Sequence, residues 1–236
     1  MDIKGSVALV TGANRGLGRA FSQLLLEHGA SKVYAGARNV DSIDIEGVTP
    51  VPLDITAPGD VAAAAARCGD VTLLVNNAGI STGTGVLAAD ALDAGRREIE
   101  TNVFGTLSMS RAFAPILGAN GGGAIVNVLS VLSWFAMPET ALYSASKSAA
   151  WSLTNSLRVE LRPQGTLVVA VHCAFLDTDM AAGVSAPKLA PASVVEQTLA
   201  AIERGEHEVL ADDISRQVRA ALAADVAALY PTVAAG

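Results

Sequence analysis

Seven short runs rich in valine, leucine and isoleucine recur along the chain, and each is closed by a turn-forming or polar residue. They occupy residues 7–12, 32–38, 48–54, 71–79, 123–130, 166–172 and 207–212. The runs are too continuous for strands with one solvated face, because such strands alternate apolar and polar residues. They are typical of strands buried on both faces, so the pattern predicts a parallel β-sheet.

Stretches of helical length separate these runs. They cover residues 16–28 and 58–67, a long segment ending near Leu117, and then residues 141–161, 191–203 and 215–229. Strand followed by helix, repeated along a chain, produces a parallel sheet with helices on both faces, and right-handed crossovers make it doubly wound. The predicted fold is a Rossmann-like α/β sheet of about seven strands. We find no linker or repeat, so a single domain spans residues 1–236.

The composition limits the partners and the cellular setting. The 236 residues are 51% hydrophobic, which suits one sizeable core, and no stretch reaches the roughly 20 apolar residues of a membrane span. A net charge of −7 argues against nucleic acid and against an anionic membrane as partners. The two cysteines, Cys68 and Cys173, lie far apart and in no metal-binding spacing. We therefore expect a reduced, cytoplasmic protein without a bound metal.

A glycine-rich turn follows the first run. In "TGANRGLG", residues 11–18, the glycines are Gly12, Gly16 and Gly18. Glycine permits a tight turn and close backbone approach to a pyrophosphate, and the helix that begins near Gly16 directs its positive end toward that anion. The spacing differs from the familiar G-x-G-x-x-G fingerprint, and a strand-to-helix turn also uses glycine for structural reasons. Its place after the first buried strand favours a dinucleotide site.

The end of the second run bears on which dinucleotide binds. An NAD site usually carries Asp or Glu here for the ribose hydroxyls, but this chain has Ala37 followed by Arg38. Arg38, together with Arg15 of the glycine turn, suits a 2′-phosphate, because guanidinium groups bind phosphate through paired hydrogen bonds. The sequence therefore favours NADP(H), with two solvated arginines as the alternative. Asp54 either accepts a hydrogen bond from the adenine amino group or caps the helix that begins near Pro58.

Tyr143 and Lys147 lie four residues apart at the start of a helical stretch, in "YSASK". This spacing places them about one turn apart on the same helix face. Such a pair is often a plain surface contact. It is also an arrangement in which an ammonium acidifies a phenol, so that the phenol can donate or accept a proton in catalysis.

Five motifs occur in an order that resembles the short-chain dehydrogenase/reductase family, over nearly the whole chain from Ser6 to Ala211. They are "TGANRGLG", "NNAG" at residues 76–79, "TNVFG" with Asn102, "IVNVLS" with Ser130, and "YSASK". Ser130 precedes Tyr143 by thirteen residues, as the active-site serine of the family typically does, whereas the nearby Ser133 fits less well.

The resemblance implies a role for each residue of the catalytic motifs. Tyr143 is expected to be the general acid in reduction, and Lys147 to favour the phenolate and hold the nicotinamide ribose. Ser130 is expected to hydrogen-bond the substrate oxygen and stabilise charge that develops there. Asn102 resembles the family asparagine of a proton relay to the lysine, with a purely structural amide as the alternative.

The resemblance also implies a set of cofactor contacts, which includes the arginines and Asp54. They are Gly12, Asn14, Arg15, Gly16, Leu17, Gly18, Arg38, Asp54, Ile55, Asn76, Ala78, Gly79, Leu176 and Thr178. One departure puts the nicotinamide pocket in question. Cys173 and Ala174 stand where the family usually has Pro-Gly, which removes glycine's freedom to adopt positive φ. Cys173 is interpreted as a small buried side chain or, alternatively, as a redox nucleophile.

The substrate is expected to be a small carbonyl compound or alcohol. The apolar residues near the catalytic motifs are Trp134, Phe135, Met137, Phe175 and Met180. Each alone is more often a core residue, but together they suggest an apolar or aromatic carbonyl. The main hypothesis is an NADP(H)-dependent carbonyl reductase or alcohol dehydrogenase. The alternatives are an NADP-linked imine reductase and a non-catalytic dinucleotide sensor. The resemblance also implies a homodimer or homotetramer.

Overall fold

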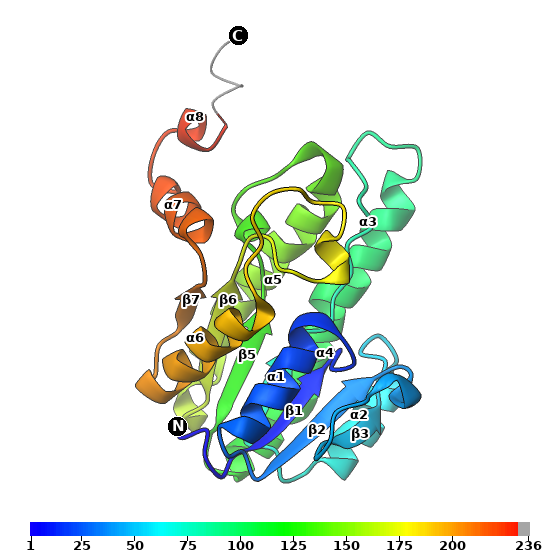
Figure 1. The fold of residues 1–236 in the computed structure, drawn as a ribbon, viewed down its shortest axis with the longest axis vertical. Coiled ribbons are helices and arrows are strands. Elements are labelled where there is room, and N and C mark those ends of the chain that lie inside the picture. The colour runs from blue at the N-terminus through cyan, green and yellow to red at the C-terminus, as the bar shows by residue number, and fades with distance from the viewer. Residues whose placement is uncertain (231–236) are drawn as a thin grey trace.

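All seven predicted strands lie side by side in one parallel sheet in the computed structural model, which describes residues 1–230 (Figure 1). Their order across the sheet is β3-β2-β1-β4-β5-β6-β7. The strands are β1 (Val7–Thr11), β2 (Lys32–Ala37), β3 (Thr49–Pro52), β4 (Leu73–Asn76), β5 (Ala124–Val128), β6 (Leu167–His172) and β7 (Glu208–Leu210). The predicted doubly wound α/β fold is confirmed.

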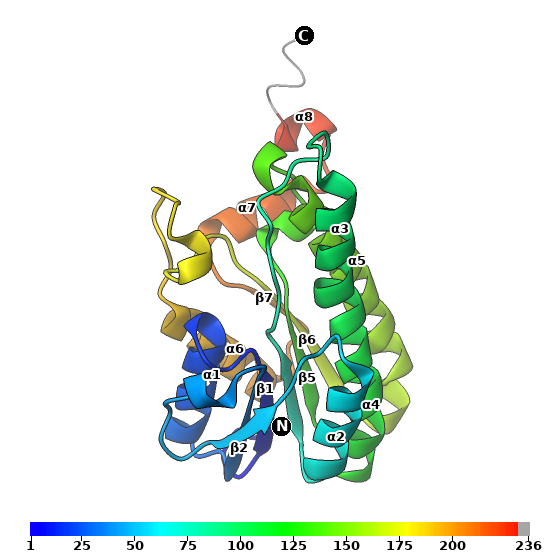
Figure 2. The same cartoon turned by 90° about the vertical axis from the view of Figure 1, so that its right-hand side faces the viewer.

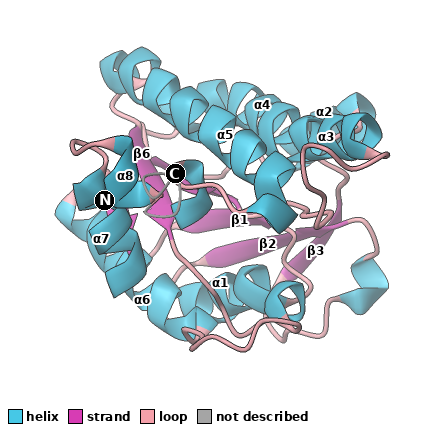
Figure 3. Cartoon of the chain, turned by 90° about the horizontal axis from the view of Figure 1, so that it is seen from above, coloured by secondary structure: helices cyan, strands magenta, loops and turns pink. Residues whose placement is uncertain are grey.

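Helices cover both faces of the sheet (Figure 3). On one face α1 (Gly16–Glu27) packs beside α6 (Pro191–Arg204). The other face is covered by α2 (Pro58–Arg67), α4 (Thr106–Ala119) and α5 (Ala141–Glu160), and α3 (Ala91–Ile99) runs into α4 and packs on α5 (Figure 2). Within residues 1–230, no helix is long and apolar enough to cross a membrane.

The strand residues alternate between two buried layers. In β1, Ala8 and Val10 join the core that contains Phe21 of α1, whereas Leu9 joins the core that contains Phe113 of α4. All five side chains are fully buried. Because both faces of the sheet are covered, most strand positions are apolar, which explains the continuous runs of valine, leucine and isoleucine.

Two helices differ from the prediction. The long helix that ends near Leu117 is interrupted by a π-helical turn at Glu100–Gly105, so that it consists of α3, this turn and α4. The helix expected over residues 215–229 is two helices, α7 (Asp213–Ala221) and α8 (Val226–Leu229). Asp225 lies between them in an extended conformation, and its carboxylate accepts a hydrogen bond from the amide of Ala227 at 2.9 Å. This cap starts a new helix rather than continuing the old one.

The strands that follow β1 in the chain lie on both sides of it in the sheet. β2 and β3 lie on one side of β1, and β4 to β7 lie on the other. The connections on the two sides therefore diverge beyond the carboxyl ends of β1 and β4, which is where open α/β sheets bind ligands.

Candidate functional site

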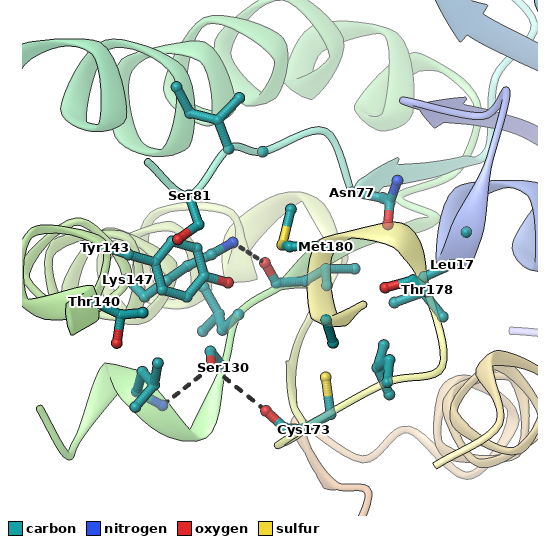
Figure 4. A pocket seen from close by; sticks show the side chains of 18 of the residues that line it. Leu17, Asn77, Ser81, Ser130, Thr140, Tyr143, Lys147, Cys173, Thr178 and Met180 are labelled. Atoms are coloured by element: carbon teal, nitrogen blue, oxygen red, sulfur yellow. Dashed lines mark hydrogen bonds between the residues drawn. The ribbon is translucent and has the colours of Figure 1, made fainter. Parts of the chain in front are cut away.

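A cavity of about 1550 Å³ lies along the carboxyl ends of the strands. It extends from the glycine-rich turn after β1 to Tyr143 on α5 (Figure 4). The predicted site residues that line it are Gly12, Asn14, Arg15, Gly16, Leu17, Arg38, Asp54, Ile55, Ala78, Gly79, Ser130, Tyr143, Lys147, Leu176 and Thr178. Three predicted residues, Gly18, Asn76 and Asn102, do not line the cavity.

The backbone of the glycine-rich turn lies close to the backbone of the loop after β4 and of the first turn of α1. Gly12 has a φ of +64°, and a Cβ atom there would lie 3.1 Å from the Cα of Ala78. A Cβ on Gly18 would lie 2.2 Å from the carbonyl oxygen of Gly12. Gly18 therefore allows the first turn of α1 to pack on the loop, and it does not line the cavity.

The amino end of α1 faces the cavity without a side-chain cap. Arg15 is the N-cap residue, and it makes no capping hydrogen bond. The first amide groups of the helix therefore lack a side-chain acceptor, and with the positive end of the helix dipole they suit a phosphate. The Arg15 guanidinium instead pairs with Asp179 across the mouth of the cavity, with 3.2 Å between Nη1 and Oδ2, and both side chains are exposed.

The asparagine pair at the end of β4 is split between the core and the cavity, and the predicted residue Asn76 is the one whose side chain lies in the core. The Asn76 amide is buried and donates to Ser110 Oγ at 3.1 Å and to Asn127 Oδ1 at 2.9 Å. Successive strand residues point to opposite faces, so Asn77 is the one that reaches the cavity. Its amide donates to the carbonyl oxygens of Thr11 and Gly12 and thereby holds the glycine turn.

Asp54 lines the cavity beside Arg38. Its Oδ1 accepts hydrogen bonds from the Thr56 hydroxyl at 2.7 Å and the Thr56 amide at 2.9 Å, and these bonds hold the pKa of Asp54 below its usual value. The α2 helix begins after Ala57 with no side-chain cap. The alternative in which Asp54 caps this helix is therefore wrong.

Tyr143 and Lys147 lie one turn apart near the start of α5, as predicted. Lys147 Nζ lies 5.6 Å from the centroid of the Tyr143 ring and donates to the carbonyl oxygen of Val128 at 2.8 Å. Ser130 stands opposite them after β5, where its Oγ accepts from the amide of Leu132 at 3.1 Å (Figure 4). The loop after β5 and the helix α5 thus bring a phenol, an ammonium and a hydroxyl to one end of the cavity.

Burial governs the proton affinities at this end of the cavity. It raises the pKa of Tyr143 above its usual value, against the smaller opposing effect of the Ser130 hydroxyl, and it lowers the pKa of Lys147 to about 8. We expected Lys147 to lower the pKa of the Tyr143 phenol, but in the protein alone this pKa is raised. Desolvation disfavours both the phenolate of Tyr143 and the ammonium of Lys147. The phenol is protonated at neutral pH, which is the form that donates a proton.

Asn102 lies in the π-helical turn and holds the loop after β4. Its Oδ1 accepts from the Ile80 amide, and its Nδ2 donates to the Ile80 carbonyl and to Ser146 Oγ, all at 2.9 Å. A Cβ on Gly79 would lie 3.0 Å from Asn102 Oδ1 and 3.6 Å from Lys147 Nζ. Asn102 is thus a near neighbour of Lys147 behind the cavity wall rather than a lining residue. π-Helical turns are frequently found at functional sites.

The departure at Cys173 and Ala174 leaves the pocket intact. Within residues 1–230 no residue other than glycine has a positive φ, so Ala174 needs none of the freedom that glycine would provide. Its amide donates to Asp212 Oδ2 at 2.7 Å. Burial raises the pKa of the Cys173 thiol to about 12, which supports its interpretation as a small buried side chain and not as a nucleophile.

His172, which ends β6, lies directly behind Ser130. Its Nδ1 donates to the Ser130 carbonyl oxygen at 3.0 Å, and its ring stacks on Trp134 with 3.8 Å between centroids. The side chain is completely buried, and burial lowers its pKa to about 4. His172 therefore supports the serine as a neutral ring.

This burial makes the stability depend on pH. The unfolded chain takes up a proton at His172 near its ordinary pKa of 6.5, whereas the folded chain does so only near 4. The free energy of unfolding should therefore fall by on the order of 3 kcal/mol from this group as the pH drops through that window. Denaturant titrations at a series of pH values measure the loss. The free energy of unfolding of His172→Asn should depend less on pH, whereas His28→Asn, at an exposed histidine, should keep the wild-type dependence. The same pH dependence in wild type and both variants would refute the assignment of this effect to His172.

Sequence reasoning missed several lining residues. Asn77 stands within the quoted "NNAG" motif, so the alternation of the strand could have identified it. Ile214, Gln217 and Val218 of α7 belong to no motif, and no local signal marks them. Among residues 1–230, no group of three or more His, Cys, Asp or Glu side chains is placed to hold a metal ion.

Comparison with known proteins agrees with this geometry. A family model described as short chain dehydrogenase matches residues 6–189. A crystal structure of a short chain dehydrogenase from Burkholderia cenocepacia in complex with NADP is 46% identical, with a TM-score of 0.94 and 98% coverage of each chain. Trans-4-hydroxycyclohexanecarboxylate dehydrogenase of Sinomonas cyclohexanicum is 35% identical over 75% of this chain and 74% of its own. Mouse dehydrogenase/reductase SDR family member 7B is 32% identical over 75% of this chain, and the match spans 60% of that longer relative.

Proposed function

The chain belongs to the short-chain dehydrogenase/reductase family, and from this premise we propose that it interconverts a ketone or aldehyde and the corresponding alcohol by using NADP(H). One observation carries the proposal. A single cavity joins the glycine turn and Arg38 at one end to Ser130, Tyr143 and Lys147 at the other. A dinucleotide bound along this cavity would place its reactive end beside a buried proton donor.

The residues present suit NADP(H). A Cβ on Gly16 would lie 3.2 Å from Thr178, so the glycine keeps the turn open at that point. The uncapped start of α1 suits the pyrophosphate, and Arg38 lines the cavity next to Ala37, where an NAD site carries a carboxylate. The Burkholderia cenocepacia relative was crystallised with NADP, which supports the same choice.

Each catalytic residue has a distinct task in reduction. NADPH supplies the hydride to the carbonyl carbon when it is bound. Tyr143 donates its phenolic proton to the carbonyl oxygen, and the Ser130 hydroxyl donates a hydrogen bond to the same oxygen, which stabilises the charge that develops there. Lys147 would hold the nicotinamide ribose hydroxyls beside Tyr143. In oxidation of the alcohol the same groups act in reverse.

Asn102 completes this arrangement by holding the loop beside Lys147. Its hydrogen bonds to both backbone groups of Ile80 fix the turn that contains Gly79. We assign it the family's role as a link in the proton relay to Lys147. The family relationship also leads us to expect a homodimer or homotetramer.

A cofactor-oxidation assay tests the proposal. Loss of the absorbance of reduced nicotinamide should be followed with aryl, cyclic and alkyl ketones, with NADPH and NADH in parallel. We expect turnover that favours NADPH. Imines in the same assay distinguish the imine reductase. Tight NADPH binding without turnover of any carbonyl compound would overturn the catalytic proposal in favour of a dinucleotide sensor.

A further inference from the structure

The end of the cavity beyond Tyr143 is closed by residues near the carboxyl end of the described chain. The C-terminal strap (residues 212–230) contains α7 and α8, which lie beyond the carboxyl ends of β6 and β7 (Figures 1 and 2). It contributes six lining residues: Ile214, Gln217, Val218, Ala221, Ala228 and Leu229. The family model ends at residue 189, so this wall lies outside the matched region.

Helical spacing explains why α7 can form a wall. Residues 214, 217, 218 and 221 recur at intervals of three and four, so they occupy one face of the helix, and that face lines the cavity. Arg216 points elsewhere, because its guanidinium pairs with Asp213 and donates to the Leu210 carbonyl. The face toward the cavity therefore carries apolar side chains and one neutral amide, that of Gln217, but no charge.

Three sets of contacts hold the strap across the cavity. At its start, Asp212 accepts from the amide of Ala174 at 2.7 Å. In the middle, Arg219 lies 5.4 Å over the Trp134 ring and pairs with Glu208 at 3.1 Å. At its end, the Tyr230 ring stacks on Phe135 with 5.1 Å between centroids, and its hydroxyl accepts from the amide of Ala136 at 2.8 Å.

The opposite walls of this end of the cavity are also apolar. Phe135, Met137 and Val184 line it together with Met180, whose side chain is 59% exposed. Ile214 on the strap is 47% exposed although it is a large apolar residue. An apolar substrate body would cover both side chains.

We propose that the C-terminal strap is the specificity-determining wall of the carbonyl site, and that it selects substrates with an apolar ring or chain bearing a neutral hydrogen-bonding group for Gln217. This inference rests on the proposed reductase function and names its substrate class. The strap presents no cation to a carboxylate on the same substrate, and Arg96 and Arg97, which also line the cavity, come from α3. A carboxylate held against the strap would therefore lack a charged partner there, and an unpaired charge is costly to bury. A neutral hydroxyl or amide could pair with the Gln217 side chain.

Matched cyclohexanones test this selection in the full-length enzyme with NADPH. The probes are 4-methylcyclohexanone, 4-hydroxycyclohexanone and 4-oxocyclohexanecarboxylate. Wild-type kcat/KM should be about 10-fold lower for the carboxylate than for the two neutral ketones, because the partly exposed strap offers the carboxylate no cation. Gln217→Leu should lower kcat/KM for the hydroxy ketone about tenfold relative to the methyl ketone, through the loss of one hydrogen bond. Gln217→Lys should raise kcat/KM for the carboxylate relative to the two neutral ketones.

Two further variants separate selection from folding. Tyr230→Ala removes the stacking and the hydroxyl, and it should raise KM for all three ketones while the Kd of NADPH stays unchanged. Arg216→Gln, on the outer side of α7, is the matched control. It should keep the wild-type order of kcat/KM among the three ketones.

The outcomes distinguish the two proposals. If the enzyme reduces ketones but both Gln217 variants keep the wild-type order of kcat/KM for the three ketones, the role proposed for the strap is refuted. The proposed reductase function is then unaffected. Failure of the wild type to reduce any carbonyl compound would overturn the proposed function, and the strap with it.

Discussion

Replacing Tyr143 by phenylalanine should reduce kcat by at least about 1000-fold while the Kd of NADPH stays the same, because general acid catalysis contributes effects of this size. The substitution removes one hydroxyl and keeps the ring at the end of the cavity. Burial raises the pKa of Tyr143 and keeps the phenol protonated, so the substitution removes the group that we propose as the proton donor. Steady-state rates with NADPH and a reactive ketone, together with fluorescence titration of NADPH, measure both quantities.

The chain offers a matched control for this loss. Tyr34 is also buried, and its hydroxyl donates to Asp70 at 2.9 Å, but it lies outside the cavity. Tyr34→Phe should therefore keep kcat within about twofold of wild type, since it touches none of the reacting groups. Turnover by Tyr143→Phe at the level of Tyr34→Phe would mean that another group donates the proton.

Replacing Arg38 by alanine should weaken NADPH binding by about 10- to 100-fold and leave NADH binding nearly unchanged, because hydrogen bonds between charged groups contribute about 1.5–3 kcal/mol each. Arg38 lines the cavity beside Asp54, and Ala37 before it offers no carboxylate to the ribose of NAD. The guanidinium is therefore expected to bind the 2′-phosphate, which only NADPH carries. Titration of both reduced cofactors into wild type and variant measures the ratio.

A second arginine controls for net charge. Arg67 at the end of α2 is exposed and lies outside the cavity, so Arg67→Ala removes the same charge and should leave both affinities unchanged. The difference between the two variants should also shrink at high salt, because screening weakens contacts with phosphate. An equal loss of NADPH and NADH affinity in Arg38→Ala would show that Arg38 supports the pocket rather than the phosphate.

The predicted cofactor residues that line the cavity include several whose position follows from local chain geometry. Gly12 and Gly16 adopt positive φ at the turn after β1, a conformation that glycine adopts without steric cost. The Tyr143–Lys147 pair depends only on helix periodicity, and both residues line the cavity. Asn76 does not line the cavity, because the motif contains two adjacent asparagines and only the pleat of β4 decides which of them faces the core.

Other features depend on segments that are far apart in the chain. Ser130 is supported by His172, which comes from the neighbouring strand β6 and stacks on Trp134. The pKa of Tyr143 is set by burial under several elements, so its direction was not predictable from the presence of Lys147 four residues away. Asn102 acts on Ile80 through a π-helical turn that the helical periodicity does not indicate.

The sequence by itself determined the parallel sheet, the alternation of strands and helices, the glycine-rich turn after β1 and the placement of Tyr143 and Lys147 on one helix face. Each of these depends on local periodicity or on the conformation of a few adjacent residues, and such preferences are encoded within one segment. Only the tertiary structure decided that Gln217 lines the cavity and that Asp212 and Tyr230 hold the strap beside it. Their contacts with Ala174 and Phe135 connect residues that carry no shared pattern, and long-range packing alone brings them together.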